Sequence, residues 1–426
     1  MGPPFCFVGN RIQAMNVSDN LVKRLSPTLF SILRETSKLA STHGVELYLV
    51  GGMTRDVLAG FQPRDPDIMA TGGFPEFPLT VAESFGGEVL KTTEFGTASL
   101  RIQDIDLDLS TARRETYDRP GALPTVFPGT VEEDMARRDF SINTMAISLS
   151  ENSWGELLDL NGGIQDLEAG LIRVLHDESF RDDATRMLRA IRYTCRNGHR
   201  LEAHTEVLLK QDLHYLDTIS GDRIRHEIEY FFLEPKVADM IEMAHEVGVL
   251  SAVHPALSVE RNTIASLHQI AAEQPDDIDL RLLALLVQSV PHGAVESVIE
   301  RLNMDSDWAR VVRDVVTVRE LAADLADENA KRSRIYEILH DLDPIAIESY
   351  AETTTNPTAA RWLRLYLDEL QYIRPLLNGD DLIALGVPQG PTIGRLLSQL
   401  LDARMNGLAT TKDDEKAFVT RSMSAG

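Results

Sequence analysis

The sequence predicts an α+β protein in which a mixed α/β region is followed by a long all-α region. Two observations support this prediction. Between residues 47 and 150, short apolar stretches are separated by turn residues, a pattern typical of strands. From about residue 165 to the end, apolar residues recur at helical spacing. With 426 residues and 43% apolar content, the chain is long enough for several domains with sizeable cores.

The mixed region opens with a helix predicted over residues 26–43. Ser26 is a candidate N-cap, and Pro27 suits the first helical position. Proline and glycine cluster at 120–129, which predicts a loop. Strands are predicted over four apolar segments between these two elements: 47–50, 88–92, 98–102 and 105–109.

The overall charge of the chain indicates which kinds of molecule it could bind. The net charge is −24, from 66 acidic and 42 basic residues, which by itself argues against binding to nucleic acid. Binding depends on local charge, however, and residues 181–200 contain six arginines against two aspartates. The two cysteines, Cys6 and Cys195, form no disulfide framework, so a reducing, cytoplasmic location is expected. No apolar run approaches the roughly 18 residues that a membrane span needs.

The strand at 47–50 runs into a glycine turn that could hold phosphates. Gly51 and Gly52 are followed by a short helix that carries Arg55. Backbone N–H groups at such a turn can bind phosphate, Gly52 would let the backbone approach a triphosphate, and Arg55 would add positive charge. A plain tight turn is the structural alternative.

Two aspartates, Asp65 and Asp67, lie one residue apart shortly after this turn. Period-two alternation puts both carboxylates on one face of a strand, where they could hold Mg²⁺ together with substrate phosphates. Two metal ions so placed could activate a hydroxyl group and stabilise a leaving pyrophosphate. A surface turn is the alternative for this pair taken alone, and Pro66 favours a turn or a strand edge.

A third carboxylate is expected from the strictly alternating segment 104–108. Asp104, Asp106 and Asp108 share one face there, and apolar residues share the other. Aligned carboxylates repel one another, so a nearby cation would stabilise them. A half-exposed strand is the alternative, and we expect it to hold for at least one of the three.

Arginines supply the positive charge that such a site needs. Arg137 and Arg138 stand next to Asp139, which could orient an arginine towards a phosphate. In the segment 180–200, with about 100° of helix rotation per residue, four arginines form a stripe about 120° wide opposite an apolar face. Arginine suits planar, bidentate recognition, and Asp183 beside Arg186 could read the edge of a nucleobase. The stripe consists of Arg186, Arg189, Arg192 and Arg196.

Together, these motifs resemble the class II tRNA nucleotidyltransferase and bacterial poly(A) polymerase family, which includes the CCA-adding enzymes. The resemblance runs from about residue 21 to the end, and the order and spacing of the motifs carry it. The resembling motifs are 50–56, 65–67, 137–143 and 182–186. The segment 112–124 looks like the flexible-loop region of the family, and 379–382 with 390–394 look like a tail segment.

The resemblance implies a nucleotidyltransferase head followed by an all-α neck, body and tail. Residues 1–20 are expected to be a disordered N-terminal extension, and Met15 is a candidate start. The implied activity is Mg²⁺-dependent, template-independent addition of C and A to the 3′ end of tRNA from CTP and ATP. The implied regions are the head at 21–165, the neck at 166–235, the body at 236–350 and a tRNA-binding tail at 351–426.

The resemblance also assigns roles to residues. Asp65 and Asp67 would bind the metal, and Asp108 matches the third catalytic carboxylate. Asp183 and Arg186 would pair with the incoming base. The residues implied to contact the nucleotide elsewhere are Gly52, Arg55, Arg138, Arg189 and Arg192.

Three positions depart from the family pattern. Pro66 stands where an aliphatic residue is usual, Asp182 replaces a glutamate, and Thr71 is one place later than a threonine of many members. CC-adding, A-adding and poly(A)-adding enzymes share these motifs, so they remain alternatives. A non-catalytic RNA-binding protein and a nucleotidyltransferase that acts on a small molecule are the alternatives from other classes. The sequence indicates no oligomeric state.

Overall fold

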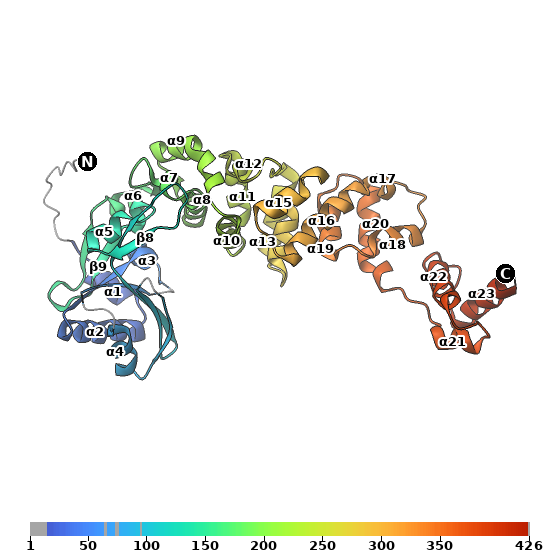
Figure 1. The fold of residues 1–426 in the computed structure, drawn as a ribbon, viewed down its shortest axis with the longest axis horizontal. Helices are drawn as coiled ribbons and strands as arrows, with labels where there is room; N and C mark the ends of the chain where they lie inside the picture. The colour runs from blue at the N-terminus through green and yellow to red at the C-terminus, as the bar shows by residue number, and fades with distance from the viewer. Residues whose placement is uncertain (1–14, 64–65, 73–75, 94–95, 425–426) are drawn as a thin grey trace. The chain divides into compact units, whose positions relative to one another are not determined.

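The computed structural model describes residues 15–424 except 64–65, 73–75 and 94–95. The chain divides into two compact units, Met1–Ile219 and Ser220–Gly426, a division that falls inside the expected neck. The first unit is mixed α/β and the second is helical, so the predicted α+β class is confirmed (Figure 1). In the described part of the chain, no helix combines the length and the apolar character needed to cross a bilayer.

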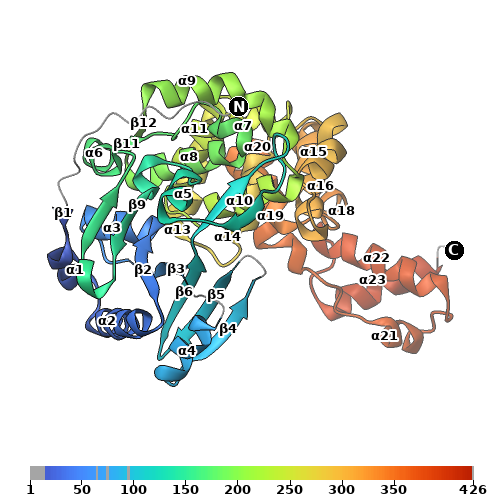
Figure 2. The same ribbon diagram turned by 60° about the vertical axis from the view of Figure 1, so that its left-hand side comes forward.

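The first unit is built on a mixed eight-stranded sheet. Its strand order is β1-β10-β9-β2-β3-β6-β5-β4, and the strands from β2 to β4 run from left to right in Figure 2. β3 and β6 pair in parallel, whereas the other neighbours are antiparallel. In sheet order the strands are β1 (Met15–Asn16), β10 (Glu156–Asp159), β9 (Met145–Ser148), β2 (Val45–Val50), β3 (Asp67–Gly72), β6 (Ile105–Thr111), β5 (Thr97–Ile102) and β4 (Glu88–Thr92).

The alternation of side chains gives this sheet two different faces. One face forms the main core with α1 (Ser18–Arg24), α2 (Pro27–Thr42), α3 (Gly51–Ala59) and α4 (Phe77–Ser84). On the other face, Met69 and Ala146 pack against Val131 and Met135 of α5 (Val131–Ala136). Successive strand residues point to opposite faces, so the polar residues of β3, β5 and β6 gather on the α5 side.

Two local predictions for this unit were wrong. Residues 15–20, expected in a disordered extension, form β1 and the start of α1, because Met15 pairs with Leu157 of β10. The loop expected at 120–129 contains strand β8 (Thr125–Pro128), which forms a hairpin with β7 (Arg113–Thr116). Pro128 is tolerated at the end of β8 because this hairpin has only two strands. The missing N–H of proline therefore breaks no hydrogen bond inside a larger sheet.

Short helices follow the sheet and complete the first unit. The helix predicted over 180–200 is two helices, α7 (Ser179–Asp182) and α8 (Thr185–Asn197). Gly198, with φ +67°, ends α8 in the left-handed conformation that glycine adopts readily. The remaining elements are α6 (Gly163–Ala169), β11 (Leu171–Ile172), β12 (Arg200–Leu201) and α9 (Ala203–Asp212).

The second unit is all-α. Helix α14 lies at its centre, with residues 282–286 fully buried, and packs against α13, α16 and α19. Its helices are α10 (Gly221–Phe232), α11 (Val237–Glu246), α12 (Val249–Val253), α13 (Arg261–Glu273), α14 (Ile278–Leu286), α15 (Val295–Arg301), α16 (Ser306–Glu320), α17 (Ala322–Leu325), α18 (Arg332–Leu339), α19 (Pro344–Thr353), α20 (Pro357–Asp368), α21 (Gly379–Ala384), α22 (Pro391–Met405) and α23 (Lys412–Ser424).

The expected boundary between body and tail, at 350/351, falls inside α19. That helix packs with α20 and α16, so the chain up to α20 belongs with the preceding helices. Helices α21–α23 have a core of their own, which includes Leu382, Leu400 and Val419. The structural boundary therefore lies nearer to residue 375, where the sequence becomes richer in glycine and proline.

Glu415 of α23 ties the segment before α21 to this C-terminal core. Its carboxylate is fully buried and accepts the backbone N–H groups of Leu376 and Leu377 at 2.8–3.0 Å. Arg404 of α22 donates to the same carboxylate at 3.3 Å. A buried charge is stable only when it is paired and hydrogen-bonded in this way.

We expect Glu415→Gln to destabilise α21–α23 by about 1–3 kcal/mol, the usual cost of leaving buried polar partners unsatisfied. The matched control is Asp413→Asn, because the Asp413 side chain is 89% exposed and pairs only at the surface with Lys416. Hydrogen exchange of the amides at 376 and 377 measures the effect. Equal protection in the two variants would contradict this role.

Candidate functional site

Strand register places three polar side chains in a row on the α5 face of the sheet. Asp67 of β3 pairs with Asp108 of β6, and Asp108 pairs with Ser99 of β5. The Ser99 hydroxyl donates to Asp108 Oδ1 at 2.6 Å. The two carboxylates of Asp67 and Asp108 therefore lie side by side. Asp65, the other predicted metal ligand, lies outside the described residues.

Pro66 fits this arrangement without distortion of the ladder. It is buried immediately before β3, and its carbonyl oxygen accepts the N–H of Asp108 at 2.9 Å. At this position the backbone has to supply a carbonyl oxygen, which proline has; proline lacks only the N–H donor. The departure from the family pattern at Pro66 is thus compatible with the carboxylate pair.

Only one of the three alternating aspartates reaches the site. Asp108 lies beside Asp67, whereas Asp106 forms an exposed bidentate pair with Arg101 at 2.7 and 2.8 Å. Asp104 lies in the exposed turn between β5 and β6. The half-exposed alternative holds for these two.

The glycine turn meets the carboxylates at Gly51. This residue has φ +63°, and a Cβ built on it would lie 2.9 Å from Arg138 Nη1 and 3.3 Å from Asp67 Oδ2. A Cβ on Gly52 would lie 3.5 Å from Arg55 Nη2, an ordinary contact. Gly52 lines the site as predicted, but the position that excludes a side chain is Gly51.

Two buried carboxylates hold Arg137 and Arg138. Asp134, in α5, accepts hydrogen bonds from both guanidinium groups at 2.7–3.2 Å. Glu115, in β7, lies 3.1 Å from both Arg113 Nη2 and Arg137 Nη1. These contacts attach the β7–β8 hairpin to the end of α5.

A second arginine cluster joins α3 to α8. Arg55 donates to Asn143 Oδ1 at 2.9 Å, and Arg189 Nη2 donates to Asp139 Oδ2 at 2.6 Å. The guanidinium carbons of Arg55 and Arg189 lie 5.3 and 5.5 Å from the ring centroid of Tyr193. Cations over an aromatic face are stabilised by its quadrupole. Phe140 packs edge-on against the same ring.

The arginine stripe of α8 faces solvent only in part, which corrects the prediction that its arginines are presented on an open face: Arg196 is exposed, but Arg189 is partly buried. Arg186 and Arg192 are only 5% and 8% exposed. Arg186 donates to Ser179 Oγ at 2.7 Å and to the carbonyl oxygen of Arg137 at 2.9 Å. Arg186 and Arg189 pack against the sheet domain because the carbonyl oxygen of Arg137 and the carboxylate of Asp139 accept their donors.

Asp183 precedes α8 and is not part of the helix. Its Oδ1 atom accepts the N–H and the hydroxyl of Thr185 at 3.0 and 2.6 Å, a local contact of the Asx-turn type just before the helix. Asp183 and Arg186 nevertheless line one cavity, so the predicted juxtaposition of acceptor and donor is present.

Most of the predicted residues converge on a cavity of about 590 Å³ in the first unit. Arg55 and Arg192 are not in this lining, but their guanidinium carbons lie 5.3 and 5.6 Å from the ring centroid of Tyr193, which is. The predicted residues that line the cavity are Gly52, Asp67, Asp108, Arg138, Asp183, Arg186 and Arg189. The lining residues that sequence reasoning did not single out for the site include Thr97, Ser110, Glu115, Tyr117 and Tyr193.

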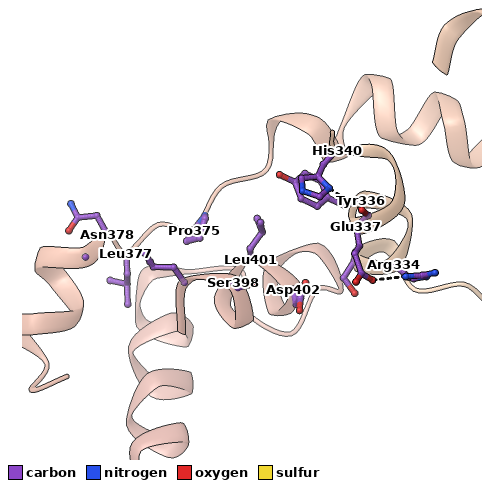
Figure 3. A pocket seen from close by; sticks show the side chains of 13 residues that line it. Arg334, Tyr336, Glu337, His340, Pro375, Leu377, Asn378, Ser398, Leu401 and Asp402 are labelled. Atoms are coloured by element: carbon purple, nitrogen blue, oxygen red, sulfur yellow. Dashed lines mark hydrogen bonds and ion pairs between the residues drawn. The ribbon is translucent and has the colours of Figure 1, made fainter. Parts of the chain in front are cut away.

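A second cavity, of about 650 Å³, lies in the second unit. Figure 3 shows Tyr336 of α18 and His340, which follows that helix, on one side and Leu401 of α22 facing them. The two rings stack with their centroids 5.1 Å apart. Among its described lining residues the one arginine, Arg334, is paired with Glu337 at 2.9 Å. This cavity offers no array of cations and carboxylates, so the first cavity is the better candidate for chemistry.

The first cavity is lined both by carboxylates, which could bind a cation, and by arginines, which could bind an anion. Burial raises the pKa of Asp67 above its ordinary value of 3.8; Arg138 opposes this rise, whereas Asp108 and Asp134 add to it. A bound cation would relieve the repulsion between the carboxylates. Burial also acts to raise the pKa of Asp139, but Arg189 and the hydrogen bond from Asn143 outweigh it and lower the value to about 2.

Comparison with known proteins agrees with this geometry. Residues 47–173 match the poly(A) polymerase head domain, and residues 198–260 match the probable RNA and SrmB-binding site of polymerase A. The mixed sheet and its cavity thus define a polymerase-type head. These two matched domains, together with the relatives described below, confirm the predicted resemblance to the tRNA nucleotidyltransferase and poly(A) polymerase family.

Three similar proteins align with nearly the whole of this chain, across both of its units. The A-adding tRNA nucleotidyltransferase of Geobacter sulfurreducens is 32% identical over 93% of this chain and 47% of its own length. The CC-adding tRNA nucleotidyltransferase of Deinococcus radiodurans is 29% identical over 94% of this chain and 96% of its own. The structure of the Thermotoga maritima CCA-adding enzyme complexed with tRNA covers 97% of this chain and 100% of that one, with 27% identity and a TM-score of 0.78.

This chain spans about half the length of some curated relatives. It covers 47% of the Geobacter sulfurreducens protein and 45% of an A-adding tRNA nucleotidyltransferase from Aquifex aeolicus, which is 31% identical. The names of the relatives comprise A-adding, CC-adding and CCA-adding enzymes. The relatives thus resemble this chain alike, although their names differ in the nucleotides that they add.

Gly51→Ala is expected to lower the free energy of unfolding by about 1–2 kcal/mol, because a side chain in the left-handed region is strained. It also displaces the Arg138 guanidinium, which the new Cβ would meet at 2.9 Å. Gly52→Ala is the matched control in the same turn. Urea unfolding curves measure both variants, and equal effects would contradict the distinction between the two glycines.

The depressed pKa of Asp139 predicts a pH dependence of stability. A carboxylate whose folded pKa lies below its unfolded value stabilises the fold above the unfolded pKa, and this contribution is lost as the pH falls towards the folded one. For Asp139 that window runs from 3.8 down to about 2. Asp139→Asn should therefore flatten the pH dependence of the unfolding free energy in this window. Asp104→Asn removes an exposed charge as a control, and identical slopes would contradict the assignment.

Proposed function

We propose that this chain is a tRNA nucleotidyltransferase that adds C and A to the 3′ end of tRNA from CTP and ATP. The observation that carries the proposal is the in-register pair Asp67–Asp108 facing Arg138 and the glycine turn. Carboxylates for a metal and cations for a triphosphate are thereby brought into one cavity. The family resemblance and the tRNA-bound and nucleotide-bound relatives support the same reading.

Mg²⁺ is the cofactor that these donors fit. The described residues contain no cluster of three or more metal-ligating side chains, yet Mg²⁺ commonly uses one or two carboxylates together with substrate phosphates. Asp67 would hold the ion with Asp65. When bound, Mg²⁺ would neutralise charge on the phosphates and on the attacking oxygen.

The residues of the chain would carry the remaining work of the reaction. The 3′ oxygen of tRNA attacks the α-phosphorus of the nucleotide, the bond to the bridging oxygen of pyrophosphate breaks, and pyrophosphate leaves. Asp108 would orient the hydroxyl and accept its proton. Arg138 and the N–H groups of the Gly51–Gly52 turn would hold the phosphates, so that catalysis rests on positioning and electrostatic stabilisation.

Base recognition is assigned to the start of α8. Asp183 and Arg186 line the same cavity and together offer an acceptor and donors for the edge of cytosine or adenine. Arg189 lines the cavity next to them, while Arg55 and Arg192 would act from outside the lining. The tRNA is proposed to contact the helical part of the chain, where residues 198–260 match a probable RNA-binding region.

A-adding activity is the second candidate. The A-adding relative from Geobacter sulfurreducens is 32% identical over nearly the whole of this chain. An A-adding enzyme would use the same carboxylates and arginines but would accept only a tRNA that already ends in CC. The two candidates therefore differ in primer and nucleotide, which one assay separates.

The assay supplies tRNA ending before the first C, at CC or at CCA, with CTP and ATP singly and together. Incorporation of CMP and AMP into the first tRNA supports CCA addition, AMP added only at CC supports A addition, and CMP alone supports CC addition. Continued addition beyond CCA would indicate a poly(A) polymerase. No incorporation into any tRNA would overturn the proposal and favour a binding protein.

Asp67→Ala should reduce incorporation about a hundredfold or more, because it removes a ligand of the charge-neutralising metal. Asp106→Asn is the matched control, since Asp106 lies on the same face but pairs with Arg101 at the surface. Single-turnover incorporation with folded variants measures both. Normal activity of Asp67→Ala would contradict the assigned site.

A further inference from the structure

Asp134 is a buried carboxylate that no step of the proposed reaction uses. It lies in α5, is 1% exposed, and is not part of the cavity lining. A capping box formed by Thr130 and Glu133 fixes the start of α5, so that Asp134 points inwards beside Met135. A buried charge at this place needs strong partners.

The partners of Asp134 are two adjacent arginines, one on each oxygen. Arg137 donates to Oδ1 through Nε and Nη2 at 2.9 and 2.7 Å, and Arg138 donates to Oδ2 through Nε and Nη2 at 3.2 and 2.9 Å. Each guanidinium group is therefore held through its Nε and Nη2 atoms. A planar guanidinium held by two of its nitrogens has its remaining nitrogen fixed in direction.

The third nitrogen of each arginine then has a defined target. Arg138 Nη1 points to the glycine turn, where a Cβ on Gly51 would lie 2.9 Å from it and 3.3 Å from Asp67 Oδ2. Arg137 Nη1 instead donates to Glu115 at 3.1 Å. Of these two arginines, Arg138 is thus aimed at the carboxylates and the turn, and Arg137 is aimed at the hairpin.

We propose that Asp134 is a positioning residue that aims the Arg138 guanidinium at the phosphates of the nucleotide. It would act through Arg138 and would not touch the substrate. The proposal rests on the proposed function, because it gives Arg138 a triphosphate to bind. It adds that the carboxylate four residues before this arginine sets its direction.

The contact of Arg137 with Glu115 gives the two arginines different directions, so that Arg138 alone of the pair is aimed at the glycine turn. Glu115 is 6% exposed and compensates the charges of Arg113 and Arg137. The N–H of Arg113 also donates to Asp134 at 3.3 Å, so one carboxylate orients Arg138 and holds the start of β7. A purely structural ion cluster would stabilise the unit equally well but would have no specific effect on nucleotide binding.

Asp134→Asn tests the proposal, because it keeps the shape of the side chain but cannot accept two charged forks. We expect the KM for CTP or ATP to rise about tenfold or more, as loss of a charge-assisted bidentate contact predicts, with a smaller change in kcat. In an Arg138→Ala background, Asp134→Asn should add no further rise in KM, since coupled residues are not additive. Additive effects, or an unchanged KM, would overturn the proposal.

Asp166→Asn is the matched control for burial. Asp166 is also buried in the first unit, accepts the same edge of Arg173 at 2.9–3.2 Å, and lies outside the cavity lining. It should lower stability but leave the KM for the nucleotide unchanged. An equal rise in KM for both variants would show a general effect of destabilisation and would overturn the specific role of Asp134.

Two further measurements keep the test decisive. If Asp134→Asn does not fold, Arg138→Lys keeps the charge but loses the fork that Asp134 holds, and it should raise KM as much; an unchanged KM would overturn the proposal. Calorimetric binding of CTP or ATP to the full chain does not require turnover. Weaker binding by Asp134→Asn would therefore support the positioning role even if the wild-type chain added no nucleotide to tRNA.

Discussion

The parallel pairing of β3 with β6 is the contact on which the site depends. It places Asp67 opposite Asp108, and the antiparallel pairing of β6 with β5 adds Ser99 to the same row. The opposite face of these strands is buried in the main core, so the register cannot slip by one residue without exposing that core. Burial of Leu107 and Leu109 thereby fixes where the carboxylates point.

Compensation of charge explains how an acidic chain holds an arginine-rich site. The net charge of −24 is a sum over the whole chain, while the cavity gathers arginines from β7, from the segment just after α5 and from α8. Asp134, Asp139 and Glu115 are buried among these arginines and pair with them. Such pairs hold the guanidinium groups in fixed directions, at the cost of desolvating both partners. A few donors can then face the cavity without a large basic surface.

The helix α8 illustrates what periodicity can and cannot predict. Its arginines fall on one side and its apolar residues on the other, as the spacing indicates. The expectation that the polar side faces outwards held for Arg196 but failed for the earlier arginines, because Asp139 and the carbonyl oxygen of Arg137, which pair with them, come from segments about fifty residues earlier in the chain. Partners so distant in sequence leave no local signal. Asp134 was missed for a different reason: its arginine partners lie only three and four residues later, but the sequence does not show that this carboxylate is the buried one that holds them both.

The sequence by itself determined the α+β class, the alternation that separates Asp108 from the core, and the order of motifs that identifies the family. These follow from local spacing and from residue chemistry, which one sequence contains in full. Tertiary structure alone decided that Gly51 is the crowded glycine, that Asp106 turns away to Arg101, and that the C-terminal core begins near residue 375. Those outcomes depend on which groups strand register and packing bring into contact: Gly51 meets Arg138 and Asp67 from distant segments, and Asp106 meets Arg101 across the β5–β6 hairpin.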